Sequence, residues 1–270
     1  MARRTARLRT VFHRALHAER RALLGWSAGV ATYAFVMTAM FPTIRSNPQI
    51  TNLYRSYPEA LRAMFSMQDL STGSGFIRTE IFSVVAPLLL TVFAVLWGSD
   101  LVAGEEDRGT IDILLANPVS RGRVLLESWA ALGVGVGVVT AGLWVGLEVG
   151  NLAFDCALPA TGLIAACTAT GLLAFCFGSL ALALGAGTGG RGLARGLTVA
   201  ILVVSYLLAT LAELISWIKP LRPISPWYHA MGVDPLGTGW RYWHLGIVLG
   251  VAVLVTTIGL SAYRRRDLAT

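Results

Sequence analysis

The sequence predicts an all-α integral membrane protein with six transmembrane helices. Hydrophobic residues make up 55% of the 270 residues and charged residues 14%, whereas a soluble domain usually carries about 25% charged residues. Six apolar stretches each approach the roughly 20 residues that a helix needs to cross a bilayer. This composition excludes a soluble enzyme and a disordered protein, and three cysteines in apolar settings are too few for a secreted disulfide scaffold.

The six spans are separated by short polar segments that contain charged residues, prolines or glycine clusters. Residues 1–22 are expected to form a separate amphipathic segment, and residues 23–270 the six-span domain. The expected spans are residues 23–42, 80–102, 129–153, 161–186, 197–217 and 243–263.

The distribution of basic residues predicts the orientation of the spans. The segments on one predicted side hold 15 of the 22 Lys and Arg residues. Because cytoplasmic loops carry the excess of Lys and Arg, both termini of this multi-pass protein are expected in the cytoplasm. These segments are residues 1–22, 103–128, 187–196 and 264–270.

Residues 5–22 have the apolar period of an amphipathic helix. Val11, Phe12, Ala15 and Leu16 share one face, and arginines occupy much of the rest. A helix of this kind lies in the inner headgroup region of a bilayer. Two interpretations fit this helix, a simple cytoplasmic anchor and an additional role in coupling.

The segment between the second and third spans begins as a short helix. Glu105 and Glu106 lie where a helix N-terminus favours negative charge. Ile111, Leu114 and Leu115 follow as an i, i+3, i+4 apolar stripe. The stripe predicts a helix on the cytoplasmic face of the membrane, buried either in lipid headgroups or in a partner protein.

The same segment contains signals for a helix end and a new helix start. Pro118 disfavours helical geometry at the preceding Asn117. Ser120 is a favourable N-cap for the helix that enters the third span. The short helix is therefore expected to end before the third span begins.

The third span is rich in glycine. Its glycines form small-xxx-small steps, which allow two helices to approach closely. The steps are compatible with packing inside one subunit and with a seam between two subunits. The glycines are Gly133, Gly137, Gly142, Gly146 and Gly150.

Two acidic residues are candidates for a substrate path. Glu148 and Glu213 fall near the outer ends of the third and fifth predicted spans, and Asp100 falls at the inner end of the second. Ionisable residues inside a membrane often serve a function. The alternative is that all three lie close enough to an interface to be hydrated.

No phosphate-binding loop of the form G-x-x-x-x-G-K-[ST] occurs in the chain. The single lysine, Lys219, precedes Pro220 in a predicted outer loop, so it cannot serve the nucleotide phosphates as a P-loop lysine does. Neither a metal-binding cluster nor a catalytic triad is apparent. The chain is therefore not expected to be catalytic alone or to bind a cofactor, and any ATP energy must come from another protein.

Two segments resemble ABC-2 type transporter permeases, the membrane half of a class of ABC exporters. They are GEEDRGTIDILLANPVSRGRVLLESW at residues 104–129 and SPWYHAMGVDPLGTGW at residues 225–240. The resemblance is to the drug or polyketide-antibiotic exporter branch in particular. The order of the spans and the amphipathic N-terminal helix agree with that family.

The resemblance implies two copies of a cytoplasmic ABC ATPase subunit, which bind ATP and Mg. It also implies a second permease, either a copy of this chain or a related chain, in a bacterial-type plasma membrane. The short helix between spans two and three would be the coupling helix, and residues 218–242 would re-enter the membrane as short helices. The positions expected at or near the ATPase contact are Glu105, Glu106, Gly109, Thr110, Ile111, Leu114, Leu115, Pro118 and Arg121.

The main functional hypothesis is a permease subunit of an ATP-driven exporter. Its substrate would be an amphiphilic or hydrophobic small molecule such as a drug, an antibiotic or a lipid-like compound. The alternative is an ion-coupled secondary transporter that uses Glu148 or Glu213. A non-transporting membrane assembly factor is a third hypothesis. Membrane lipid is an expected partner, and nucleic acid is not.

Overall fold

The chain folds into a bundle of long antiparallel helices. The computed structural model describes residues 11–47, 49, 52, 56–58, 70–107 and 120–266. Within these ranges all of the regular secondary structure is helical. Six of the helices are long and apolar enough to cross a membrane. The predicted fold class, an all-α multi-pass membrane protein, is therefore confirmed.

The six long helices correspond to the six predicted spans. The second one is a continuous run of three elements, α5 (Gly73–Ile77), the π-helix η1 (Arg78–Phe82) and α6 (Val85–Asp100). The others are α2 (Arg20–Arg45), α9 (Arg121–Phe154), α10 (Ala160–Thr188), α11 (Arg191–Leu211) and α13 (Tyr242–Arg265).

The fifth helix differs from its predicted bounds of 197–217. It begins at Arg191, directly after the turn at Gly189, and it ends at Leu211. The apolar residues that follow, among them Leu214 and Ile218, form turns instead of a further helical stretch. Glu213 pairs there with Arg222, across the place where the chain folds back.

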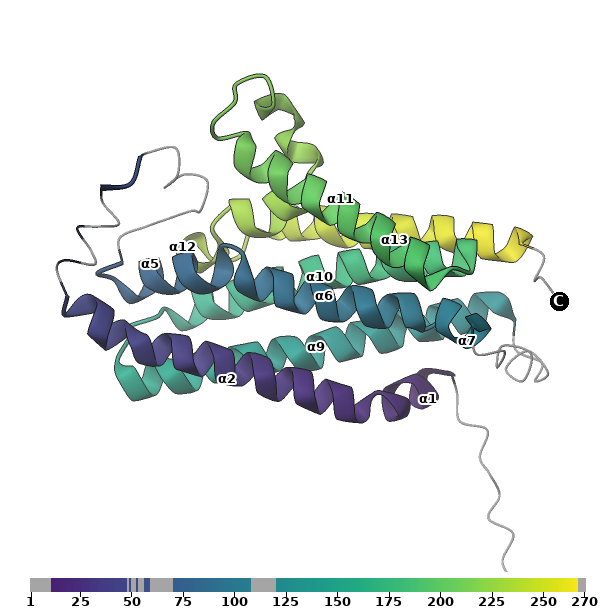
Figure 1. The fold of residues 1–270 in the computed structure, drawn as a ribbon, viewed down its shortest axis with the longest axis horizontal. Coiled ribbons are helices and arrows are strands. Elements are labelled where there is room, and N and C mark those ends of the chain that lie inside the picture. The colour runs from purple at the N-terminus through teal and green to yellow at the C-terminus, as the bar shows by residue number, and fades with distance from the viewer. Residues whose placement is uncertain are drawn as a thin grey trace, which may run out of the picture.

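The two ends of the bundle differ in composition (Figure 1). The C-terminal end of α13, α1 (Val11–Ala18) and α7 (Ala103–Asp107) lie at one end, which we call the basic end. The opposite end carries α5 and the short helices before α13, and we call it the hairpin end. The arginines of the basic end come from the segments that the sequence assigns to the cytoplasm.

Helix α10 occupies the centre of the bundle. In its most apolar stretch 72% of the residues are buried, compared with 22% in α2 and in α13. Small side chains make this burial possible, because they let helix backbones approach closely. In a bilayer the hydrophobic effect does not drive helices together, so close packing has to hold them. At the crossing of α6 and α10, a Cβ atom on Gly98 would lie 2.4 Å from the carbonyl oxygen of Gly178.

The glycines of α9 lie mainly against other helices of the same chain. A Cβ on Gly146 would lie 2.2 Å from the carbonyl oxygen of Ala31 in α2. Gly142 approaches the backbone of α2 at Ser27 and Gly150 approaches the side chain of Thr38 in α2, whereas Gly133 faces Phe175 of α10. A Cβ on Gly137 would meet no other group within 4 Å among the described residues, so that position is open.

Helix α1 packs its apolar face against the protein. Phe12, Ala15 and Leu16 are half-buried against the main core. The backbone N–H of Phe12 donates a 3.2 Å hydrogen bond to Oε2 of Glu127 in α9. Residues 5–10 of the predicted amphipathic helix lie outside the described residues.

Short helices precede α13, as predicted for this segment. They are the 3₁₀-helix η2 (Lys219–Ile224), the π-helix η3 (Tyr228–Gly232) and α12 (Pro235–Thr238). Two serines attach them to α11: the Ser225 hydroxyl donates a 2.6 Å bond to the Ser205 carbonyl, and the Trp227 N–H bonds to Oγ of Ser205. Residues 212–241 are called the hairpin below.

The packing of α9 on α2 can be tested with two alanine substitutions. Alanine raises helix propensity equally at both glycines, by about 1 kcal/mol. Gly146→Ala should nevertheless lower stability by about 1–3 kcal/mol, because its new methyl group meets backbone. Gly137→Ala is the matched control and should be neutral or stabilising. Thermal unfolding in detergent, followed by tryptophan fluorescence, measures both, and equal midpoints would contradict this packing.

Candidate functional site

The candidate site is the basic end of the bundle, where the segment between α6 and α9 begins and ends. Glu105 and Glu106 lie in α7, and Arg121 opens α9. Ser120 caps α9 as expected, since its hydroxyl accepts from the N–H of Arg123. The remaining positions of the predicted ATPase contact lie outside the described residues; these are Gly109, Thr110, Ile111, Leu114, Leu115 and Pro118.

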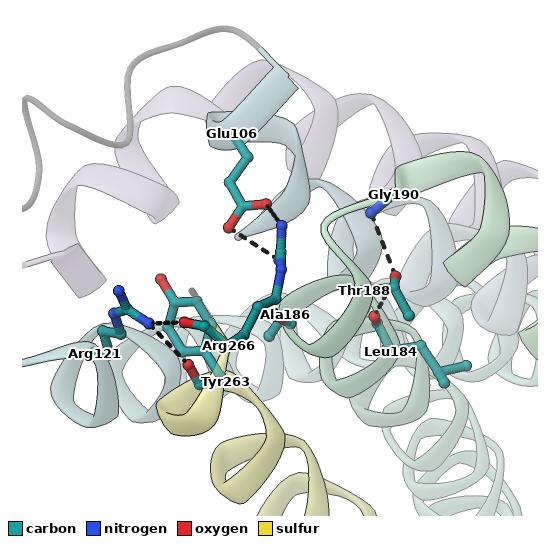
Figure 2. A network of polar contacts seen from close by, with 8 residues as sticks. All are labelled: Glu106, Arg121, Leu184, Ala186, Thr188, Gly190, Tyr263 and Arg266. Atoms are coloured by element: carbon teal, nitrogen blue, oxygen red, sulfur yellow. Dashed lines mark hydrogen bonds and ion pairs between the residues drawn. The ribbon is translucent and has the colours of Figure 1, made fainter. Parts of the chain in front are cut away.

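Glu106 forms a forked ion pair with Arg266, the C-cap residue that follows α13 (Figure 2). Nη2 of Arg266 lies 2.9 Å from Oε2 of Glu106, and Nη1 lies 3.2 Å from Oε1. The Glu106 and Arg266 side chains are only 11% and 23% exposed. Forked arginine–carboxylate pairs are among the stronger hydrogen-bonded contacts and fix orientation as well as distance.

The same arginine also contacts α10. Nη1 of Arg266 donates a 3.2 Å hydrogen bond to the carbonyl oxygen of Ala186. Gly189, which ends α10 with φ +75°, makes room for the pair. A Cβ atom there would lie 2.0 Å from Nη2 of Arg266 and 2.6 Å from Oε2 of Glu106.

Arg121 reaches the end of α13 from the start of α9. Its Nη1 donates to the carbonyl oxygens of Arg266 and Tyr263, the latter at 3.2 Å (Figure 2). Its guanidinium carbon lies 5.8 Å from the centre of the Tyr263 ring. We call Glu106, Arg121, Tyr263 and Arg266 the clasp.

Glu105 points to a different neighbour than Glu106 does. Its Oε2 accepts a 2.9 Å bond from Nη2 of Arg14 in α1. The Arg14 side chain is 47% exposed, so this pair is weaker than the clasp. Beneath α1 lies a cavity of about 70 Å³, lined in part by Trp97 and by Ser128, whose buried hydroxyl has no hydrogen-bond partner among the described residues.

Asp100 is paired at the basic end of α6. Its Oδ1 lies 3.2 Å from Nη1 of Arg191 and 3.2 Å from Nη2 of Arg195, both at the start of α11. Arg195 also donates from Nε to the Ser99 hydroxyl at 2.8 Å. Asp100 thus joins the ends of α6 and α11.

The two acidic candidates for a substrate path have different surroundings. Glu213 follows α11 and forms an ion pair with Arg222, which lies 4.4 Å above the Tyr228 ring. Glu148 lies in α9, and its Oε2 is buried with no hydrogen-bond partner among the described residues. Glu213 therefore belongs to the hairpin, whereas Glu148 remains available for another partner.

Sequence reasoning missed a histidine pair at the hairpin end. Nδ1 of His229 lies 2.7 Å from Nδ1 of His244 in α13, and Nε2 of His229 lies 2.7 Å from the Pro223 carbonyl. Because a carbonyl only accepts, Nε2 of His229 donates to it. The two Nδ1 atoms are joined by one N–H···N hydrogen bond, in which one ring donates and the other accepts. No spacing in the sequence signals this contact, since 15 positions separate the two residues.

Comparison with known proteins adds one finding. The family model described as ABC-2 family transporter protein matches residues 10–268. No curated protein matches the chain.

The buried tyrosine of the clasp gives a test of its packing. The Tyr263 hydroxyl is fully buried and has no hydrogen-bond partner among the described residues. Tyr263→Phe should therefore leave stability unchanged or raise it by up to about 1 kcal/mol. Tyr263→Ala should lower it by about 3–5 kcal/mol, because it leaves a cavity. Thermal unfolding of both variants checks this, and a large loss in Tyr263→Phe would show that the hydroxyl has a partner.

Proposed function

The chain belongs to the ABC-2 transporter family and is the membrane-spanning permease subunit of an ABC transporter, and we propose that a cytoplasmic ATPase binds its basic end and drives its conformational change. Membership of the family implies association with an ABC ATPase, and the permease subunit is not itself catalytic. We place the ATPase contact on the segment from Glu105 to Arg121, with the basic end facing the cytoplasm.

One observation carries this proposal: both ends of that segment are fixed to the ends of membrane-spanning helices. Glu106 is bonded to the end of α13 and to the turn after α10 through Arg266. Arg121 is bonded to the end of α13 directly. A segment fastened in this way can pass a displacement to the spans, whereas a free loop would absorb it.

We propose that two ATPase copies act on two permeases, either identical or related, and that substrate passes between the permeases. The substrate would be an amphiphilic or hydrophobic small molecule moved out of the cell. Large apolar side chains cover the outer faces of α11 and α13, as lipid or a second permease requires. The buried Oε2 of Glu148, which has no hydrogen-bond partner among the described residues, suits a cationic amphiphile.

The ATPase contact can be tested by co-purification. Replacing Leu114 and Leu115 together with Asp places charge on the proposed contact. Loss of buried apolar anchors at an interface typically costs about 2 kcal/mol or more. Recovery of the ATPase with the tagged permease should therefore fall by roughly tenfold or more.

The double substitution of the same two leucines by Ile is the matched control, since it keeps the apolar stripe. It should recover the ATPase as the parent does. Unchanged recovery with the Asp variant, at equal permease yield, would place the ATPase contact elsewhere.

The buried Oε2 of Glu148, for which the described part of the chain offers no hydrogen-bond partner, also favours a second candidate, an ion-coupled secondary transporter. Vesicles that contain the chain alone can be given a pH gradient and a fluorescent amphiphilic cation. We expect no gradient-driven movement of the cation without the ATPase. Movement by the lone chain that disappears in Glu148→Gln would instead establish the ion-coupled mechanism.

A further inference from the structure

We infer that Arg266 is a positioning residue that fastens both ends of the ATPase-contact segment to α13, so that α13 moves with that segment when the ATPase changes state. The inference rests on the proposed function and extends it. Spans two and three are continuous with the segment, so their movement needs no additional contact. Movement of α13 does need one, and Arg266 supplies it.

Arg266 is bonded on both sides of the segment. Its guanidinium holds Glu106, which precedes residues 108–119, at 2.9 and 3.2 Å. Its carbonyl oxygen accepts from Arg121, which follows them. Because the two contacts use different parts of one residue, they do not compete, and a displacement entering from either side reaches α13.

The clasp resists rotation as well as separation. A planar guanidinium bound through two nitrogens holds a carboxylate in one orientation. The same guanidinium also donates to the Ala186 carbonyl, and this bond fixes it relative to α10. Helices α10 and α13 are themselves in close contact, because a Cβ on Gly259 would lie 2.5 Å from Cβ of Ala183. Helix α13 is therefore held both at its end and along its length.

The other end of α13 contacts the hairpin. His244 lies in the first turn of α13, and it shares a hydrogen with His229 of the hairpin. His229 is in turn bonded to the Pro223 carbonyl. One rigid helix therefore joins the clasp to the hairpin at the opposite end of the bundle, and the inference predicts movement along its whole length.

The test uses the permease co-purified with its ATPase and reconstituted in lipid. Cys156, Cys167 and Cys176 are replaced by Ala, and one spin label is attached at a new cysteine. The label is placed at Ile258 of α13, which is 58% exposed, or at Val92 of α6, which is 37% exposed. Spectra are recorded without nucleotide and after trapping with ATP and vanadate.

In the parent, both labels should change on trapping. In Arg266→Ala and in the isosteric Glu106→Gln, the label at Val92 should still change, and the change at Ile258 should be smaller than in the parent, because only the backbone contacts of Arg121 with the end of α13 remain. The charge swap Glu106→Arg with Arg266→Glu should restore it. A purely structural role would lower stability in the single variants without separating the two labels.

The inference is overturned if the label at Ile258 responds in Glu106→Gln and Arg266→Ala as in the parent, or if it does not respond in the parent while Val92 does. These results would leave the proposed function intact. Failure of the parent to co-purify with any ATPase, or lack of response at both labels, would instead overturn the proposed function and this inference with it. If Arg266→Ala does not fold, Glu106→Gln alone decides.

Discussion

The exclusion of charge from the bilayer interior is the constraint on which the rest of this structure depends. A charged group at the centre of a bilayer is costly, so charged residues move to helix ends or form pairs. Helix α10, at the centre of the bundle, contains no charged residue between Ala160 and Thr188. The clasp and the Asp100 pairs lie at the basic end, and Glu213–Arg222 lies in the hairpin. Charged directional contacts therefore fix helix ends, whereas close packing and a few neutral hydrogen bonds, such as those of Trp129 with Ser179 and of Ser27 with Val138, hold the rest.

This division determines how the molecule can move. In the middle, α6 meets α10 at Gly98 and Gly178, and α2 meets α9 at Ala31 and Gly146, without side chains between the backbones. Such contacts tolerate small shifts of one helix against another better than a forked ion pair does, because they contain no directional bond. A displacement applied at the end of a helix should therefore shift the whole helix and not bend it.

The sequence predicts the number of spans and the positively charged side well, because both depend on composition and period. It predicts the fifth span less well. Hydropathy does not distinguish an apolar helix from apolar turns, and contacts such as Glu213 with Arg222 and Ser225 with Ser205 show where the chain folds back. Sequence also places Glu105 and Glu106 at a helix start without revealing their partners. The Glu106 partner lies 160 positions away, and no local signal specifies a contact of that range.

The two adjacent acids show why the partners matter for mechanism. Consecutive residues on a helix point about 100° apart, so Glu105 faces α1 and Glu106 faces α13. The α1 pair uses a single nitrogen of a half-exposed arginine, and water can replace it at little cost. The α13 pair is forked and largely buried, and separating it would leave a charge without a partner. The Glu106 connection to α13 is therefore stiffer than the pair of Glu105 with Arg14, and a displacement of α7 is passed to α13 more readily than to α1 through that pair.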